Sequence, residues 1–196
     1  MGFRLSWVAI HGKSRDEIHR VLAITATGTY EEFPESPCTG ALLSDGWYLV
    51  VKNCEFFKDC GFFDNDEQLS KLSDKCVVIM SFVHEGIMVS YAAEWRNGKR
   101  IWSTLHNSQK ALDHFEARGE LPSTYNSIRQ QLETKQAEHG RGVDYIFDIP
   151  VEIAKSITGY RHDAIVTTVD ERGFEVLRID EPPPNLSWFH WVLRKF

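Results

Sequence analysis

Aromatic, histidine and arginine side chains recur through residues 84–106 and are the first candidates for a binding site. The pair Asn97-Gly98 predicts a two-residue hairpin turn, because these residue types tolerate the positive φ angles of a type I′ turn. Side chains alternate between the faces of a strand, so this turn and a second one at Glu85-Gly86 predict one large aromatic face. That face would carry Met80, Phe82, His84, Val89, Tyr91, Trp95, Arg100, Trp102 and His106.

Two interpretations of this aromatic face stay open. Helices that pack on it would make it part of the hydrophobic core, which is where most aromatic side chains are used. A partly open groove would instead make a small-molecule site, with Arg100 stacked on Trp95. The residues of this alternative pocket are His84, Trp95, Arg100, Trp102 and His106.

A metal site is not predicted. In this arrangement His84 and His106 lie two strands apart, with Cβ atoms on the order of 11 Å from each other, too far for two ligands of one zinc ion. Cys54 and Cys60 have five residues between them, which is outside the spacing of structural zinc sites. We therefore expect neither a metal nor another cofactor.

Acidic residues are concentrated in two stretches of the chain. Residues 30–35 contain three glutamates, and residues 54–74 contain six acids against two lysines, a local balance of −4, with phenylalanines interleaved. Solvated loops explain such a pattern, but aromatic residues among acids are also typical of a surface that binds a basic protein. The candidate partner-binding residues are Glu31, Glu32, Glu35, Phe62, Phe63, Asp64, Asp66 and Glu67.

Complete catalytic motifs are missing from the sequence. It contains no G-x-S-x-G, P-loop, H-E-x-x-H or G-x-G-x-x-G pattern. In the polar cluster 160–163, His162 and Asp163 are adjacent, so in an extended chain they point in opposite directions and do not form an orienting pair. We expect that cluster to close a helix end and to make local salt bridges, and we do not expect an enzyme.

The elements that must position these residues follow from the hydrophobic pattern. Strands are predicted over residues 3–10, 47–51, 77–84, 87–95, 100–106, 164–169 and 173–179. Helices are predicted over residues 66–72, 109–117, 124–138 and 150–158, and after the capping box Ser14-Arg15-Asp16-Glu17. Residues 28–46 are rich in proline and glycine and are expected to be mostly loop.

These elements predict the fold class. Three consecutive antiparallel strands over residues 77–106 form a meander, so we expect an α+β fold in which an antiparallel sheet packs with several short helices. A length of 196 residues suits a single domain over residues 1–196. A proline-rich linker and an aromatic tail occupy residues 181–196.

The composition excludes several classes of partner. A net charge of −6 argues against nucleic-acid binding, which needs a basic surface. No run of about 18 apolar residues is present, so no membrane span is expected. The N-terminus lacks the pattern of a signal peptide, so the expected location is cytoplasmic, with the four cysteines reduced. A homodimer formed through the C-terminal tail stays open.

Three segments resemble a family of small, largely uncharacterised bacterial proteins: GWYLVV at 46–51, MVSYAAEWRNGKRIWSTLHN at 88–107 and VDYIFDIPVEIAKSITGYRHD at 143–163. Some members of that family are similar to immunity proteins encoded beside secreted toxins, including type VI secretion effectors. The resemblance implies a bacterial protein that binds and blocks a cognate toxin. The acidic balance favours a nuclease as that toxin, because nuclease sites are basic.

Overall fold

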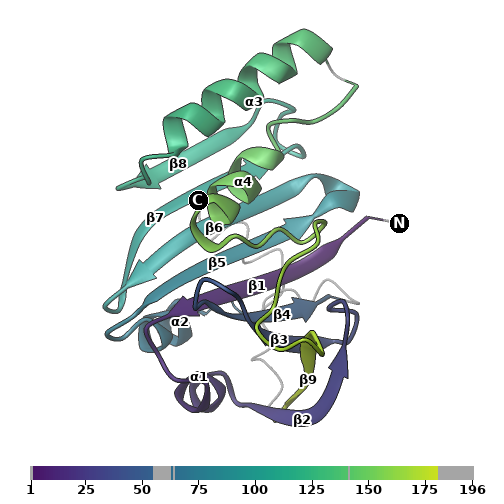
Figure 1. Cartoon of the computed structure of the whole chain (residues 1–196). Coiled ribbons are helices and arrows are strands. Elements are labelled where there is room, and N and C mark those ends of the chain that lie inside the picture. Colours follow the sequence, from purple (N-terminus) through teal and green to yellow (C-terminus); the bar gives the residue numbers. More distant parts are fainter. Residues whose placement is uncertain (1, 55–62, 64, 141, 181–196) are drawn as a thin grey trace.

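The structure is a computed structural model that describes residues 2–54, 63, 65–140 and 142–180. In this part of the chain, nine strands form one antiparallel sheet in the order β2-β9-β3-β4-β1-β5-β6-β7-β8 (Figure 1). The strands are β1 (Arg4–His11), β2 (Ile24–Glu31), β3 (Cys38–Leu42), β4 (Tyr48–Asn53), β5 (Val77–His84), β6 (Val89–Arg96), β7 (Lys99–Asn107), β8 (Phe115–Gly119) and β9 (Phe174–Ile179).

Four α-helices are described: α1 (Arg15–Leu22), α2 (Asp66–Leu72), α3 (Tyr125–His139) and α4 (Asp148–Thr158). Together with the sheet they confirm the predicted α+β class. None of the described helices is long and apolar enough to cross a membrane. The predicted linker and tail at 181–196 lie outside the described residues.

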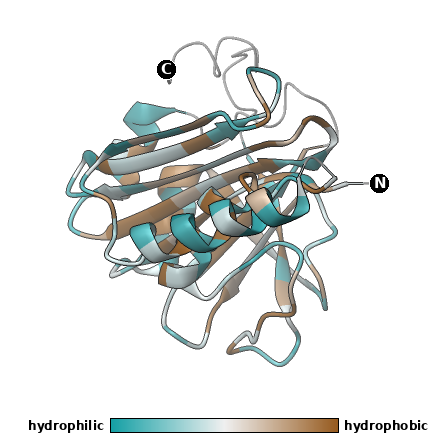
Figure 2. Cartoon of the chain, turned by 90° about the horizontal axis from the view of Figure 1, so that it is seen from above, coloured by the Kyte–Doolittle hydropathy of each residue, from teal (hydrophilic) through white to brown (hydrophobic). Residues whose placement is uncertain are grey.

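Both faces of the sheet are buried, and hydrophobic residues follow its central strands (Figure 2). One face, which we call the α1 face, packs against α1 and α2 through Ile18, Leu22, Leu69 and Leu72. The other, the α4 face, packs mainly against α4 through Ile149, Ile153 and Ala154. Helix α3 adds Tyr125 and Leu132 to the α4 face and leaves most of its surface exposed.

Three local features predicted from the sequence are present in the structure. Ser14 and Glu17 form the predicted capping box at the start of α1. Asn97 and Gly98 take positive φ angles of 49° and 77° in the turn between β6 and β7. Helix α4 ends at Gly159, whose φ of 74° lets the chain leave the helix.

The predicted common aromatic face is wrong, because the meander contains a β-bulge. Trp95 pairs with Arg100 as predicted, but the next pair is Glu94 with Trp102, so Ile101 is an extra residue on β7. A slip of one residue moves every following side chain to the opposite face. Trp102 therefore packs on the α4 face, whereas Trp95 packs on the α1 face.

The turn between β5 and β6 also differs from the prediction, without the same consequence. Residues Glu85–Ile87 form a 3₁₀ turn, and His84 pairs with Val89 rather than with Ile87. This displacement is an even number of residues, so the alternation of faces survives. The predicted face of β5 and β6 is kept, with Met80, Phe82 and Tyr91 together in one core cluster.

Three expected elements are corrected by the structure. Residues 28–46 are not mostly loop, because β9 lies between β2 and β3 and pairs with both. Residues 109–117 are not a helix: the side chains of Asn107 and His114 accept backbone N–H donors, and β8 begins at Phe115. Residues 164–169 are not a strand and contribute only an isolated bridge at Thr168.

Candidate functional site

The five residues of the alternative pocket do not line a common groove. Trp95 lies on the α1 face and Trp102 on the α4 face, where its Nε1 donates to Oε2 of Glu94 at 2.9 Å. Arg100 is exposed, and His84 is buried, which lowers the pKa of its imidazole.

His106, the fifth of these residues, ties neighbouring segments to the sheet. It is fully buried, with Nδ1 at 2.8 Å from the carbonyl oxygen of His114 and Nε2 at 2.9 Å from Oδ2 of Asp144. These contacts join β7 to the segments before β8 and before α4. Both ring nitrogens are therefore engaged in holding the fold together.

The second acidic stretch is separated from the first by the sheet. Asp66 and Glu67 are exposed in the first turn of α2, which packs on the α1 face. Phe63 is fully buried in that core and is not a surface residue. Phe62 and Asp64 lie outside the described residues.

The first acidic stretch, in contrast, borders a cavity. Glu32 and Glu35 belong to the rim of a pocket of about 350 Å³, which we call the acidic–aromatic pocket. It is lined by Phe3, Leu5, Glu32, Phe33, Pro34, Glu35, Asn53, Tyr160, His162, Asp163, Ala164, Ile165, Val166 and Phe174. Leu5, Tyr160 and Phe174 are core residues of the α4 face, so this pocket and α2 lie on opposite faces of the sheet.

Apolar side chains at this pocket are unusually exposed. Phe33 is 50% exposed, Phe3 is 45% exposed and Ile165 is 92% exposed. Single exposed apolar residues are normal on a protein surface, but a group of them around one cavity marks an interaction site.

Hydrogen bonds hold the acidic loop in place. Glu31 accepts from the backbone N–H groups of Glu35 and Ser36 at 2.7 and 2.9 Å, and from the Ser36 hydroxyl. Asn53 Nδ2 donates to the carbonyl oxygens of Pro34 and Ser36. Glu31 is thus occupied with the loop itself, whereas Glu32 and Glu35 are exposed at the rim.

The opposite wall of the acidic–aromatic pocket is held in place by Arg161, which follows the C-terminal end of α4. Arg161 forms ion pairs with Asp148 and Glu152 of α4 and with Asp163. Burial would raise the pKa of Asp163, but hydrogen bonding to Arg161 and the nearby positive charges together outweigh it, and the pKa is lowered. The salt bridges predicted for residues 160–163 are therefore present, and they fix the wall that carries Tyr160 and His162.

Two buried polar atoms in this wall have no hydrogen-bond partner within the described part of the chain. They are Oη of Tyr160, a residue 2% exposed, and Nδ1 of His162, a residue 8% exposed. The other nitrogen of His162, Nε2, is 3.2 Å from Oε1 of Glu85, whose Oε2 accepts the N–H of Phe3. A carboxylate only accepts, so Nε2 donates, and Nδ1 of the neutral ring is an acceptor.

Buried polar groups are almost always hydrogen-bonded, so these two atoms are candidates for contact with a bound group. Burial also raises the pKa of the Tyr160 hydroxyl, which keeps it protonated and able both to donate and to accept. The pocket thus combines an acidic rim, apolar walls and two buried polar atoms.

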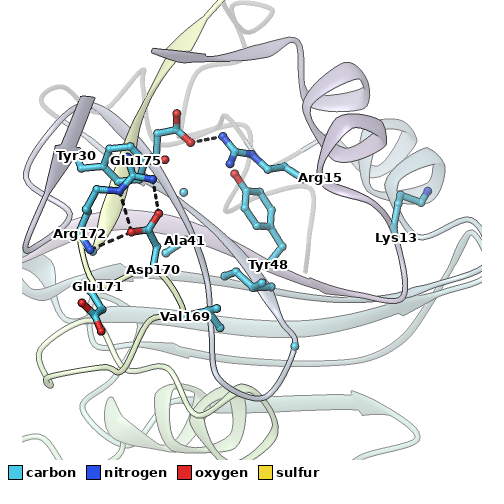
Figure 3. A pocket seen from close by; sticks show the side chains of 14 residues that line it. Lys13, Arg15, Tyr30, Ala41, Tyr48, Val169, Asp170, Glu171, Arg172 and Glu175 are labelled. Carbon is cyan, nitrogen blue, oxygen red and sulfur yellow. Dashed lines mark hydrogen bonds and ion pairs between the residues drawn. The ribbon is translucent and has the colours of Figure 1, made fainter. Parts of the chain in front are cut away.

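A second cavity of about 830 Å³ opens on the other side of the same strands (Figure 3). We call it the tyrosine–arginine pocket. It is lined by Lys13, Arg15, Tyr30, Gly40, Ala41, Leu42, Gly46, Tyr48, Val169, Asp170, Glu171, Arg172, Gly173 and Glu175. Its walls come from α1, from strands β2, β3, β4 and β9, and from the loop before β9.

Ion pairs and aromatic contacts order this second pocket. Arg172 binds both carboxylate oxygens of Asp170 and holds the pKa of that side chain at about 2. The Arg172 guanidinium lies 3.7 Å from the centre of the Tyr30 ring. Arg15 forms an ion pair with the buried Glu175 (Figure 3).

The described residues show neither a metal-binding cluster nor an exposed thiol. Among the described residues, no group of three or more His, Cys, Asp or Glu side chains is placed to hold a metal ion. Cys38, Cys54 and Cys76 are buried free thiols, and burial raises the pKa of Cys38 to about 12. Cys60 lies outside the described residues.

Sequence reasoning identified the acidic rim but not the walls of the acidic–aromatic pocket. The available signal for Phe33 was an aromatic residue inside a loop of glutamates. Tyr160 and His162 stood in a cluster that was expected to close a helix end and to make local salt bridges. Comparison of the chain with protein-family models, with curated proteins and with solved structures gave no match.

Proposed function

We propose that this protein is a bacterial immunity protein that captures a basic segment of its cognate toxin in the acidic–aromatic pocket. The observation that carries the proposal is the pairing of unpartnered buried atoms, Tyr160 Oη and His162 Nδ1, with exposed apolar side chains at one acidic rim. A binding site that offers acceptors in its wall and carboxylates at its rim selects a cationic partner.

A lysine or arginine side chain of the partner fits this chemistry. Its aliphatic stem would pack on Phe33 and Ile165, as long charged side chains do on apolar surface. Its charged head has only donors, which match the Tyr160 hydroxyl oxygen and the acceptor nitrogen of His162. Glu32 and Glu35 would add charge attraction at the rim.

Toxin neutralisation is the biological form of this proposal that the sequence resemblance favours. An immunity protein occludes its toxin by binding, and the basic active site of a nuclease is a suitable target for an acidic loop. The proposal includes a cytoplasmic location, where such a protein would meet an incoming toxin. It requires no catalysis and no cofactor from this chain.

The competing hypothesis, a small molecule or substrate bound on the aromatic sheet face, has less support. The β-bulge divides its residues between two faces, with Trp95 and Trp102 in opposite cores and Arg100 exposed.

The test begins with gel filtration of the protein mixed with the product of the adjacent gene, which should give a stable complex. Association rates are then measured for the double variant Glu32→Lys/Glu35→Lys at low and high salt. The variant should associate about tenfold more slowly at low salt, and its rate should depend less on salt. Glu31 is left unchanged because it holds the loop.

The matched control is Asp66→Lys/Glu67→Lys, which reverses the same charge on the opposite face of the sheet. It should associate at the wild-type rate. If the control is slowed and the loop variant is not, the toxin binds at α2 and the proposed site is wrong.

Tyr160→Phe provides a sharper probe of the pocket itself. It removes a hydroxyl without an internal partner in the described chain, so the free protein should keep its stability. The complex should dissociate about tenfold faster, because a charge-assisted hydrogen bond is worth about 1.5–3 kcal/mol. An unchanged dissociation rate would show that the partner does not reach this hydroxyl.

A further inference from the structure

The tyrosine–arginine pocket contains as many acidic as basic side chains. The acids use more of their hydrogen-bonding capacity within the protein than the bases do. Its acids are Asp170, Glu171 and Glu175, and its bases are Lys13, Arg15 and Arg172. Charge alone therefore does not indicate a ligand. The ligand is indicated by which of these groups keep unused hydrogen-bond donors or acceptors.

Two of the three carboxylates are saturated by the protein. Glu175 accepts from Arg15 with Oε2 and from the N–H of Gly28 with Oε1. Asp170 accepts from Arg172 with both oxygens and also from the backbone N–H of Arg172. Only Glu171, which is exposed, has no ion pair within the described residues.

The basic groups keep donors to spare. In the described part of the chain, Arg15 donates to Glu175 and to the Tyr48 hydroxyl, and Arg172 uses Nε and Nη2 on Asp170. Lys13 makes one contact, at 3.4 Å, with the carbonyl oxygen of Lys71. A guanidinium has five N–H donors and an ammonium has three, so all three side chains can donate further.

We infer that the tyrosine–arginine pocket binds a small organic anion, a carboxylate or phosphate ester that carries an aromatic or apolar group. Arg172 is held in place by Asp170 and by the Tyr30 ring, so a free donor is presented without much loss of side-chain freedom (Figure 3). This function is independent of toxin binding.

The apolar part of the ligand has a matching wall. Leu42 is 43% exposed and Val169 is 58% exposed at the pocket, and Leu42 pairs with Tyr48 across β3 and β4. Gly40 lets the Tyr48 hydroxyl pack directly against the floor, because a Cβ there would lie 2.6 Å from Oη of Tyr48. Ligand pockets commonly combine apolar walls with a few polar groups of this kind.

The experiment is a titration of the full chain with benzoate, phenyl phosphate and the neutral amide benzamide, followed by backbone amide chemical shifts. Both anions should bind with a Kd of about 1 mM or tighter. The shifts should centre on Gly40, Ala41 and Gly173. Benzamide should bind at least about tenfold more weakly, because it lacks the charge that the spare donors would pair with.

Two variants and a control locate the site. Arg172→Gln should weaken benzoate binding about tenfold, and Val169→Trp, at an exposed position, should block it by filling the mouth. Arg178→Gln changes an arginine that is 69% exposed and outside the pocket, and it should have no effect.

No binding of either anion to the folded protein would overturn the inference. So would equal binding of benzamide, shifts that centre elsewhere, or unchanged binding by Arg172→Gln.

Discussion

The two halves of the sheet are built in opposite ways. Strands β5 to β8 follow one another in the sequence and in space, so each pairs with its neighbour across a short connection. In the other half, β9 lies between β2 and β3, although it follows them by more than a hundred residues. Both candidate pockets border this second half.

The difference shows where a binding site arises in this fold. The meander packs its side chains into the two cores, and its turns predict which strands are neighbours. The other half brings together α1, the acidic loop and the segment 160–173, which are distant in sequence. Cavities remain where such segments meet. Their side chains come from elements distant in the sequence, whose packing against one another no local sequence pattern sets.

The largest effect is expected from emptying the meander core. Trp102 is 1% exposed, and Trp102→Ala should lower the free energy of unfolding by about 3–5 kcal/mol. Arg100→Ala, two positions away and exposed, should change it by no more than about 0.5 kcal/mol. Urea denaturation measures both. Similar values for the two variants would contradict the bulge that separates these neighbours.

A smaller effect is expected from the ion pair that links the two ends of the chain in the other half. Glu175→Gln keeps an acceptor for Gly28 but removes the charge that pairs with Arg15. Because Arg15 is 43% exposed, the loss should be only about 1–2 kcal/mol. Glu171→Gln, in the same pocket, should leave stability within about 0.5 kcal/mol of the wild type. Equal losses would mean that Glu175 acts through something other than this pair.

A still smaller effect should appear as a dependence of stability on pH. Burial lowers the pKa of His84 in the meander and of His19 beside Tyr48 below the usual 6.5. The unfolded chain then binds protons that the folded protein does not. This contribution is complete above about pH 6.5 and is lost as the pH falls through the folded values.

Denaturation between about pH 7.5 and pH 5 checks this prediction. His84→Asn and His19→Asn should each flatten the decline of stability with falling pH. A slope that neither variant alters would place the titration elsewhere.

The smallest effect is expected for the cysteine thiols. Their reaction rates are measured, and no change in stability is expected. Cys38 in β3 and Cys76 before β5 are buried, and burial raises the pKa of each thiol. A thiol reagent reacts with the thiolate, so both residues should react slowly in the folded protein and quickly in denaturant. Mass spectrometry of the labelled peptides measures each rate. Rapid labelling of Cys38 in the folded protein would contradict its burial.

The sequence by itself determined the parts of this protein that depend on neighbours along the chain. The capping box of α1, the Asn97-Gly98 turn and the end of α4 at Gly159 were predicted because each requires only a few adjacent residues with particular backbone preferences. The α+β class followed from the same local patterns. The acidic rim at Glu32 and Glu35 was also visible as a composition signal.

Tertiary structure alone decided the register of the meander and the place of the pockets. No residue pattern announced the extra residue Ile101, yet it sent Trp102 and His106 to the other face. The prediction of loop over residues 28–46 failed because β9 supplies hydrogen-bond partners from the far end of the chain. Tyr160 and Phe33 meet at one cavity for the same reason: pairing between distant segments depends on the whole fold, which local preferences cannot specify.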